Sequence, residues 1–330
     1  MSYAEKLLKS VQNHTVFDFH NQTMPYQNEM KCHIGFGIDD GYARCLGAAI
    51  ASICVHNKNS LLVFHIMASK LSADTISRLE KLAETFKFEL NLYEIDEKVF
   101  HSLPTQVHLP IPTYFRFLLP LLVKDVDRVL YMDADMVCQA SLENLFQLDL
   151  QNKIIAAVPD LKKLGDKRNA VLGLENHIYF NAGLILIDIN QWNAYNVADK
   201  VMSALTTDPK KFRYLDQDAL NLVLVGQIYY FEQKYNRINV PGAKWEDTVV
   251  IHFAAHPKPW MIAWPLASTA DTKIKDCYKT YEAMTPWENT PLALPKSYKE
   301  MKIYSRCLRQ HGAHLKSLYW YLQYIIRKFR

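Results

Sequence analysis

Two aspartates separated by one residue, Asp133 and Asp135, directly follow the apolar run VLYM. A carboxylate pair released at the end of a buried strand lies where open α/β sheets bind their ligands. Carboxylate oxygens suit a hard divalent cation, and the phosphate oxygens of a ligand can complete its coordination. The pair, with Ala134 between its members, therefore predicts a metal site that also binds phosphate.

Two other interpretations of the segment DADMV stay open at this point. The aspartates could simply begin a turn after the strand, because Asp is common in turns. The same letters also fit the nucleophile motif of haloacid-dehalogenase-like phosphatases. The motif alone therefore does not choose a reaction.

A second carboxylate pair, Asp39 and Asp40, follows an earlier apolar run and precedes a helical pattern. This is again a position where a strand ends and a ligand can bind, and Tyr42 beside it could stack on a base. The simpler interpretation is a helix N-cap.

Single charged residues in apolar surroundings are further candidates. Arg116 interrupts YFRFLLP, where it is either a surface side chain or a phosphate-facing one. Asp216 stands where a helix begins, a position that favours Asp in any protein. His252 and Lys258, in HFAAHPKPW, suit a metal ligand and a phosphate-binding cation.

Apolar runs that alternate with helical patterns must position these side chains. Alternation of this kind predicts crossover connections and a largely parallel sheet. We expect strands at 33–38, 61–67, 88–95, 127–132, 154–160 and 179–189, a strand that leaves into a loop within 248–260, and helices at 2–12, 42–57, 72–86, 112–123, 190–205 and 215–226. After residue 265 the pattern is helical, with proline-rich breaks at 286–295.

Composition excludes several classes of protein. Hydrophobic residues make up 49% of the 330 residues and charged residues 22%, which is typical of globular proteins. The net charge of +4 is too small to indicate a nucleic-acid binder. Six cysteines without CxxC spacing predict reduced thiols and a cytoplasmic location. The N-terminal residues lack the apolar core of a signal peptide, and no apolar run approaches the roughly 20 residues of a membrane span.

Charge is unevenly distributed along the chain. Residues 296–330 contain nine Lys or Arg and one Glu, so this tail carries +8 and residues 1–295 carry −4. Apolar residues recur there at helical spacing: Leu315, Leu318, Tyr319, Leu322, Ile325, Ile326 and Phe329. A basic amphipathic helix predicts binding to an anionic membrane surface. The alternative is an ordinary helix that packs on its own domain.

Taken together and in order, GIDDGY, YFRF, LYMDADMV, YFNAG, DQD and HFAAHPKPW resemble glycosyltransferase family 8. The resemblance covers roughly residues 31–265 and is strongest to the retaining enzymes that extend the bacterial lipopolysaccharide core. It implies a GT-A fold, in which a Rossmann-like mixed sheet has helices on both faces. It also implies three regions: an N-terminal extension (1–30), a catalytic domain (31–265) and a helical basic C-terminal region (266–330).

The resemblance assigns roles to individual residues. Asp133, Asp135 and His252 match the family's ligands for Mn²⁺ or Mg²⁺, and Lys258 matches its diphosphate-binding lysine. Donor-binding positions match Asp39, Asp40, Tyr42, Arg116, Ala134 and Asn181. Catalytic positions match Gln217, Asp216 and Asp160.

Two residues depart from the family pattern. Gly41 stands where many relatives carry Asn, so a ribose contact is in doubt. Ala255 replaces a glycine, and its methyl group could crowd the diphosphate, although His256 could compensate as a donor.

The implied reaction transfers glucose or galactose from a UDP-sugar to the lipopolysaccharide core, with an α linkage. Loss of UDP places positive charge on the sugar ring. Gln217 is an amide and a poor nucleophile, which favours front-face attack over a covalent intermediate. The expected location is cytoplasmic, on the inner face of the inner membrane. The alternatives are a UDP-sugar or glycan-binding module without turnover and, less favoured, a dehalogenase-like phosphatase.

Overall fold

A mixed sheet forms the centre of the computed structural model, which describes residues 1–20, 30–105, 111–240, 243–267, 271 and 273–329. Within these residues the sheet has eight strands in the order β1-β4-β3-β2-β5-β8-β7-β9. They are β1 (Val11–Asp18), β2 (Lys31–Ile38), β3 (Leu61–Ala68), β4 (Glu89–Ile95), β5 (Arg128–Met132), β7 (Ile155–Pro159), β8 (Phe180–Asp188) and β9 (Ile228–Tyr230).

Strand direction departs from the largely parallel sheet that the alternation predicts. β2, β3, β4 and β5 are parallel, but β8 runs antiparallel to both of its neighbours, β5 and β7. β1 is antiparallel to β4 at the edge. The mixed sheet implied by the family resemblance is confirmed.

This topology gathers several chain segments at one edge of the sheet. β2, β5 and β7 all end there, and β8 begins there, because it runs the other way. In the register of β7 and β8, Val158 pairs with Asn181 and Pro159 with Phe180. Residues just after three strands and at the start of a fourth therefore meet.

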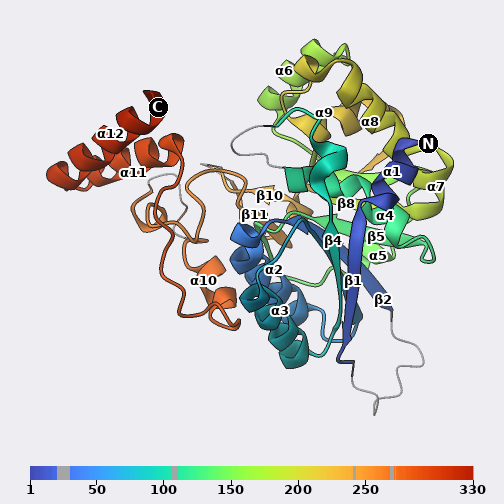
Figure 1. Ribbon diagram of the computed structural model, residues 1–330, viewed down its shortest axis with the longest axis horizontal. Helices are drawn as coiled ribbons and strands as arrows, with labels where there is room; N and C mark the ends of the chain where they lie inside the picture. The colour runs from blue at the N-terminus through green and yellow to red at the C-terminus, as the bar shows by residue number, and fades with distance from the viewer. Residues whose placement is uncertain (21–29, 106–110, 241–242, 268–270, 272, 330) are drawn as a thin grey trace.

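Helices cover both faces of the sheet, each over its own apolar core, as expected (Figure 1). One face carries α2 (Ala43–His56), α3 (Ala73–Phe86) and α10 (Cys277–Glu282). The other carries α1 (Tyr3–Lys9), α4 (Leu119–Leu122), α7 (Ile189–Ala194), α8 (Val197–Thr207) and α9 (Leu215–Val223). Two further helices are α5 (Glu143–Phe146) and α6 (Lys162–Leu172).

A small sheet of β6 (Met136–Cys138), β10 (Arg237–Ile238) and β11 (Val250–His252) adjoins the central one. β11 runs antiparallel to β6, with His252 opposite Met136. The backbone N–H of Phe253 donates to the Asp135 carbonyl at 2.9 Å. This pairing brings the segment after β11 beside the two aspartates.

The N-terminal segment differs from its prediction. The helix predicted over 2–12 begins at a capping box made by Ser2 and Glu5 but ends at Lys9. Val11–Asp18 is instead an edge strand. Most of its residues are at least partly exposed, so it lacks the apolar run used to recognise the other strands. Of the predicted extension 1–30, residues 21–29 lie outside the described residues.

Two other predicted helices are broken or shortened. The helix at 112–123 is a 3₁₀ helix (Ile111–Phe117) followed by the short α4, which has Pro120 in its first turn. The helix at 190–205 divides into α7 and α8 at Asn196, whose φ is 55°. Within 248–260 the strand is β11, and the chain then leaves it into a loop, as predicted. The short elements β6, β9, β10, α5 and α6 were not predicted.

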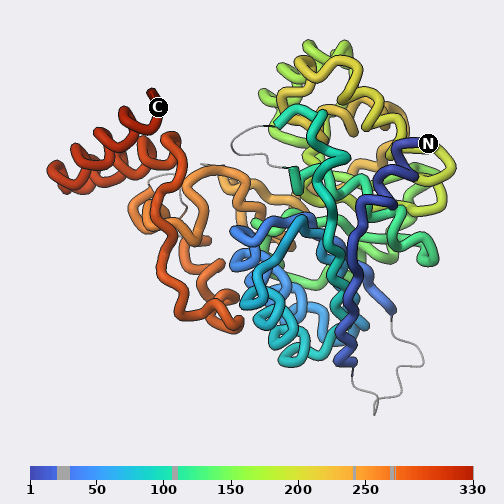
Figure 2. Tube along the Cα trace, in the orientation of Figure 1, coloured from blue at the N-terminus to red at the C-terminus, as the bar shows by residue number. Residues whose placement is uncertain are grey.

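The C-terminal region first packs on α2 through α10 and then continues as an extended segment. It ends in two helices, α11 (Tyr298–Gln310) and α12 (His314–Phe329). Figure 2 shows this red hairpin at one end of the molecule, apart from the central sheet. Among the described residues, no helix has both the length and the apolar character needed to cross a membrane.

Candidate active site

A cavity of about 530 Å³ opens at the edge of the sheet where β2, β5 and β7 end. Every residue with a predicted role lines it except Asp40. These residues are Asp39, Tyr42, Arg116, Asp133, Ala134, Asp135, Asp160, Asn181, Asp216, Gln217, His252 and Lys258. The fold therefore brings together side chains that are more than 200 residues apart in sequence.

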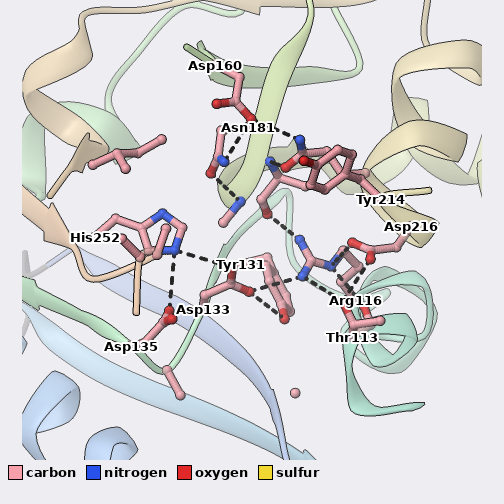
Figure 3. Close-up of a pocket in the computed structure, with 18 of the residues that line it drawn as sticks. Thr113, Arg116, Tyr131, Asp133, Asp135, Asp160, Asn181, Tyr214, Asp216 and His252 are labelled. Carbon is pink, nitrogen blue, oxygen red and sulfur yellow. Dashed lines mark hydrogen bonds and ion pairs between the residues drawn. The ribbon is translucent and has the colours of Figure 1, made fainter. Parts of the chain in front are cut away.

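Two carboxylates and an imidazole form a cluster on one wall of the cavity (Figure 3). His252 Nε2 lies 3.3 Å from Asp135 Oδ1 and 3.8 Å from Asp133 Oδ2. One ligand atom from each of the three residues falls within 4.8 Å of the others. This is the spacing and donor set of a divalent-cation site.

The tautomer of His252 supports this interpretation. Its Nδ1 lies 3.0 Å from Asn236 Oδ1, while Asn236 Nδ2 donates to Asn181 Oδ1 at 2.9 Å. The Asn236 oxygen therefore faces the ring, and the single proton of a neutral imidazole sits on Nδ1. Nε2 then presents a lone pair to the two aspartates, as metal coordination requires.

Two further observations fit a cation. Asp135 Oδ1 is buried without a hydrogen-bond partner, although it faces His252 Nε2. A Cβ on Gly183 would lie 2.6 Å from His252 Cε1 and 2.9 Å from Asp133 Oδ2. Only glycine at this position leaves room between the ligands, so the residues present fit the predicted Mn²⁺ or Mg²⁺.

Lys258 lies on the other side of Asp135. Its buried ammonium donates to Asp135 Oδ2 at 2.6 Å and to the carbonyl oxygens of Phe253 and Ala254 at 2.6 and 3.1 Å. Burial would raise the pKa of Asp135, but the positive charge of Lys258 holds it well below its ordinary value. Asp135 is therefore a carboxylate throughout the physiological pH range.

Arg116 organises the floor of the cavity. Its guanidinium contacts Asp133 Oδ1 at 3.0 Å and Asp216 Oδ2 at 2.9 Å, and it also donates to the carbonyl of Ala182. Thr113 donates to Asp216 Oδ1 at 2.7 Å. Burial raises the pKa of Asp216 to about 6, against the opposing charge of Arg116. Arg116 is thus a buried cation that holds two site carboxylates, not a surface side chain.

A third cluster joins Asp160, Asn181 and Gln217. Asp160 Oδ2 accepts from Gln217 Nε2 at 2.9 Å and from Asn181 Nδ2 at 3.1 Å. The Gln217 carbonyl oxygen accepts the backbone N–H of Ala182 at 3.0 Å. Both ends of the Gln217 amide are therefore fixed, and its oxygen and nitrogen are assigned by their partners.

The residues near Asp39 that are predicted to bind the donor lie in two different environments. Asp39 caps the 3₁₀ turn that leads into α2, and Tyr42 follows it beside the cavity. Asp40 instead accepts from the backbone N–H and hydroxyl of Ser72 at 2.9 and 3.1 Å, outside the main cavity. Ala255, which stands where the family pattern has glycine, lines the cavity, and its N–H donates to Asn239 Oδ1 at 3.2 Å.

Several residues that support the site were not predicted. Asn236 orients His252. The Thr113 hydroxyl donates a hydrogen bond to Asp216, and the Tyr131 hydroxyl donates one to Asp133 at 3.3 Å. Tyr131 stands two residues before Asp133 on a predicted strand, so alternation could have placed it on the same face. Asn236 has no such signal, because it lies in an irregular segment and acts only through its neighbours.

Comparison with known proteins identifies the family. The sequence model described as Glycosyl transferase family 8 matches residues 33–262, and that described as Glycosyl transferase family 8 C-terminal matches residues 275–328. The chain is 29% identical over 315 residues to the lipopolysaccharide 1,3-galactosyltransferase of Salmonella typhimurium, which covers 90% of this chain and 91% of that protein. It is also 29% identical over 314 residues to a lipopolysaccharide 1,2-glucosyltransferase of Escherichia coli, with coverages of 90% and 91%.

Solved structures show the same fold. The galactosyltransferase LgtC, in complex with donor and acceptor sugar analogues, matches with a TM-score of 0.68 and 23% identity, over 78% of this chain and 96% of that one. The WbbM bifunctional glycosyltransferase matches with a TM-score of 0.62 and 24% identity, over 87% of this chain and 52% of that one. The predicted GT-A fold is confirmed. The chain is a glycosyltransferase, and it belongs to glycosyltransferase family 8.

Proposed function

We propose that this glycosyltransferase moves glucose or galactose from a UDP-sugar to the lipopolysaccharide core, with retention of the α configuration. The observation that carries the proposal is the division of one cavity into two ends. Asp133, Asp135 and His252 lie at one end, and Gln217 with Asp160 lies at the other. A sugar diphosphate needs both a cation site and a polar sugar site.

At the first end, Asp133, Asp135 and His252 would hold Mn²⁺ or Mg²⁺. When bound, such a cation supplies charge stabilisation to the departing diphosphate. Lys258 is a second positive group within the same cavity, and its ammonium already donates to a ligand carboxylate. One well-placed charge of this kind is worth a few kcal/mol, on the order of 3.

At the second end, we place Gln217 at the β face of the transferred sugar. Its amide is held by Ala182 N–H and Asp160, so its carbonyl dipole has a fixed direction. A carbonyl oxygen has two lone pairs, and one remains for the positive charge that develops on the ring. Arg116 and Asn181 orient the neighbouring carboxylates Asp216 and Asp160.

Retention then follows from front-face attack. The Gln217 side chain donates a hydrogen bond to Asp160, which accepts two hydrogen bonds through one oxygen and the N–H of Leu161 through the other. Such a carboxylate is a stabilised anion and a weakened nucleophile. The acceptor hydroxyl attacks from the leaving-group side, and the departing phosphate takes its proton.

A donor panel tests the proposal. Purified protein with Mn²⁺ is incubated with UDP-glucose, UDP-galactose or UDP-N-acetylglucosamine, and the slow hydrolysis that releases UDP is measured. We expect turnover of UDP-glucose or UDP-galactose and none of p-nitrophenyl phosphate. Hydrolysis of the phosphate ester alone would instead support a phosphatase, and tight UDP binding without turnover would support a binding module.

The acceptor proposal rests on the C-terminal hairpin as well as on the relatives. On α12 the predicted apolar face is exposed, from Leu315 at 86% to Ile325 at 36%. Ser317 and Tyr324 are the buried residues of this helix, since α12 packs on α11 through Ser305 and Ser317. Lys316, Arg327 and Lys328 lie on the same helix. An exposed basic amphipathic helix suits an anionic membrane surface, where an anchored acceptor would be met.

A further inference from the structure

A second cavity, of about 500 Å³, adjoins the first. The two cavities share four lining residues: Asp39, Tyr42, His256 and Lys258. The opposite wall of the second cavity comes from the C-terminal region, including Pro291, Leu294 and Lys296. The part of the proposed donor site beside Asp39 and Tyr42 is therefore continuous with a second cavity, which residues of the catalytic domain and of the C-terminal region enclose together.

A buried arginine fixes this wall to the catalytic domain. Arg44, on α2, forms a buried ion pair with Glu282 on α10, with its Nη2 3.0 Å from Glu282 Oε2. The same guanidinium donates to the carbonyl oxygens of Thr290 and Pro291 at 2.8 and 2.7 Å. α2 begins directly after Asp39 and Tyr42, so the wall and the base-binding residues share one anchor.

A short backbone pairing fixes the other side of the wall. Ala293 N–H donates to the Trp260 carbonyl at 2.8 Å, and Ile262 N–H donates to the Ala293 carbonyl at 3.0 Å. Trp260 is two residues after Lys258. The extended segment is therefore held in register with the loop that carries the phosphate-binding lysine.

Two exposed side chains point to an occupant. Leu294 lines the cavity and remains 58% exposed, and Lys296 lines it as an exposed cation. Asp39 lines the same cavity as Lys296. Burial raises the pKa of Asp39, and the positive charge of Lys296 opposes this shift. A flat base with carbonyl acceptors and one N–H donor would meet an apolar side chain, a cation and a carboxylate here.

We propose that the extended segment 291–296 is a wall of the subsite for the nucleoside end of the donor. Leu294 packs on the pyrimidine base, and Lys296 donates a hydrogen bond to one of its carbonyl oxygens. The inference rests on the proposed function, because it assumes a UDP-sugar donor. It adds that the C-terminal region binds nucleotide and does more than carry the terminal hairpin.

Binding of UDP and of UMP, each with Mn²⁺ and measured by isothermal titration calorimetry, tests the inference. Leu294→Ala and Lys296→Ala are compared with Leu292→Ala and Lys299→Ala. The control positions are an exposed leucine and an exposed lysine that are not among the described residues lining either cavity. We expect each test variant to weaken both ligands by about 3- to 10-fold, as for one lost contact or hydrogen bond, and each control to bind like wild type.

Three results would overturn the inference. One is unchanged UDP binding in both test variants. The second is a loss of affinity for UDP without a loss of affinity for UMP, which would indicate that the substituted residue contacts the diphosphate. The third is a raised KM for the acceptor with unchanged nucleotide binding. Failure of the proposed function is distinct, because wild-type protein would then either bind neither nucleotide or bind UDP without turning over any UDP-sugar in the donor panel.

Discussion

Asn236 accepts the Nδ1 proton of His252 at 3.0 Å and donates to Asn181 at 2.9 Å. Through Asn181 the chain of hydrogen bonds continues to Asp160 and then to Gln217. One buried asparagine thus joins the metal-binding end of the cavity to the sugar-binding end. The orientation of the proposed third metal ligand and that of the sugar-binding amides are set by the same network.

Replacement of Asn236 tests this coupling. Asn236→Ala removes the acceptor that fixes the His252 tautomer, so we expect Mn²⁺ affinity to fall by about 10- to 100-fold. Asn236→Asp keeps an acceptor for Nδ1 and should lose less affinity. Both are measured by titration with Mn²⁺ and electron paramagnetic resonance. Equal affinity in wild type and Asn236→Ala would refute the orienting role.

Gln217→Ala should slow the reaction without abolishing donor binding. Loss of one electrostatic stabiliser predicts a fall in kcat of about 10²-fold. The UDP-sugar affinity should stay near that of wild type, because the metal end of the cavity is unchanged. Steady-state kinetics and calorimetry measure the two quantities separately. Isolation of a sugar covalently bound to Gln217 would contradict the account.

A buried histidine pair should make stability depend on pH. His33 Nδ1 lies 3.0 Å from His65 Nε2, and burial lowers the pKa of His33 to about 4 and that of His65 to about 3, from an ordinary 6.5. At pH values between the lowered pKa values of the folded protein and 6.5, these two histidines bind more protons in the unfolded chain than in the folded one. The free energy of unfolding should therefore fall as the pH is lowered from 6.5 toward 3, by several kcal/mol, at about 1.4 kcal/mol per unit of pKa shift.

Urea denaturation from pH 7 to pH 4.5 measures this dependence. In a His33→Gln/His65→Gln double variant the slope with pH should be shallower than in wild type. His101→Gln, at an exposed position, should retain the wild-type slope. Identical slopes in all three proteins would rule out the pair as the cause.

The exposed face of α12 should bind anionic vesicles. Deletion of α12 would also uncover α11, so substitutions are the sharper test. Leu318→Ser/Leu322→Ser should weaken binding to vesicles that contain anionic lipid, whereas Val16→Ser/Val171→Ser, at exposed positions on other elements, should not. Binding should weaken with salt, since each basic residue near the surface contributes about 1 kcal/mol. Vesicle sedimentation measures the effects of the substitutions and of salt. Binding that changes neither with salt nor with the α12 substitutions would contradict the proposal.

The sequence predicted the elements whose side chains are buried and apolar. β2, β3, β4, β5, β7 and β8 all appear, within one or two residues of their predicted bounds, because their apolar runs have few competing interpretations. The antiparallel direction of β8 could not be predicted from the alternation, since direction depends on how the chain crosses the sheet. β1 was missed because an exposed edge strand needs little apolar surface.

The residues of the candidate site likewise divide into those that the sequence could predict and those that it could not. Residues in motifs, such as Asp133 and His252, were named as candidates because their types suit metal binding and their order resembles a family. Asn236 and Gly183 were not named, because an asparagine that acts through a histidine and a glycine that leaves space have no chemical signal of their own. Asp40, which was named with Asp39, accepts hydrogen bonds from Ser72 and lines the second cavity, so its predicted role in donor binding stays a prediction.

The most direct test of the central claim follows the anomeric carbon during transfer. Wild-type protein, Mn²⁺, the UDP-sugar donor and a lipopolysaccharide core acceptor are monitored by ¹H NMR, beside Asp135→Asn and a sample with EDTA. We expect an α-linked product, no turnover in EDTA, and a fall of about 10³-fold or more in Asp135→Asn, because cation stabilisation of the leaving group is worth several kcal/mol. A β-linked product, or full turnover in EDTA, would contradict the account.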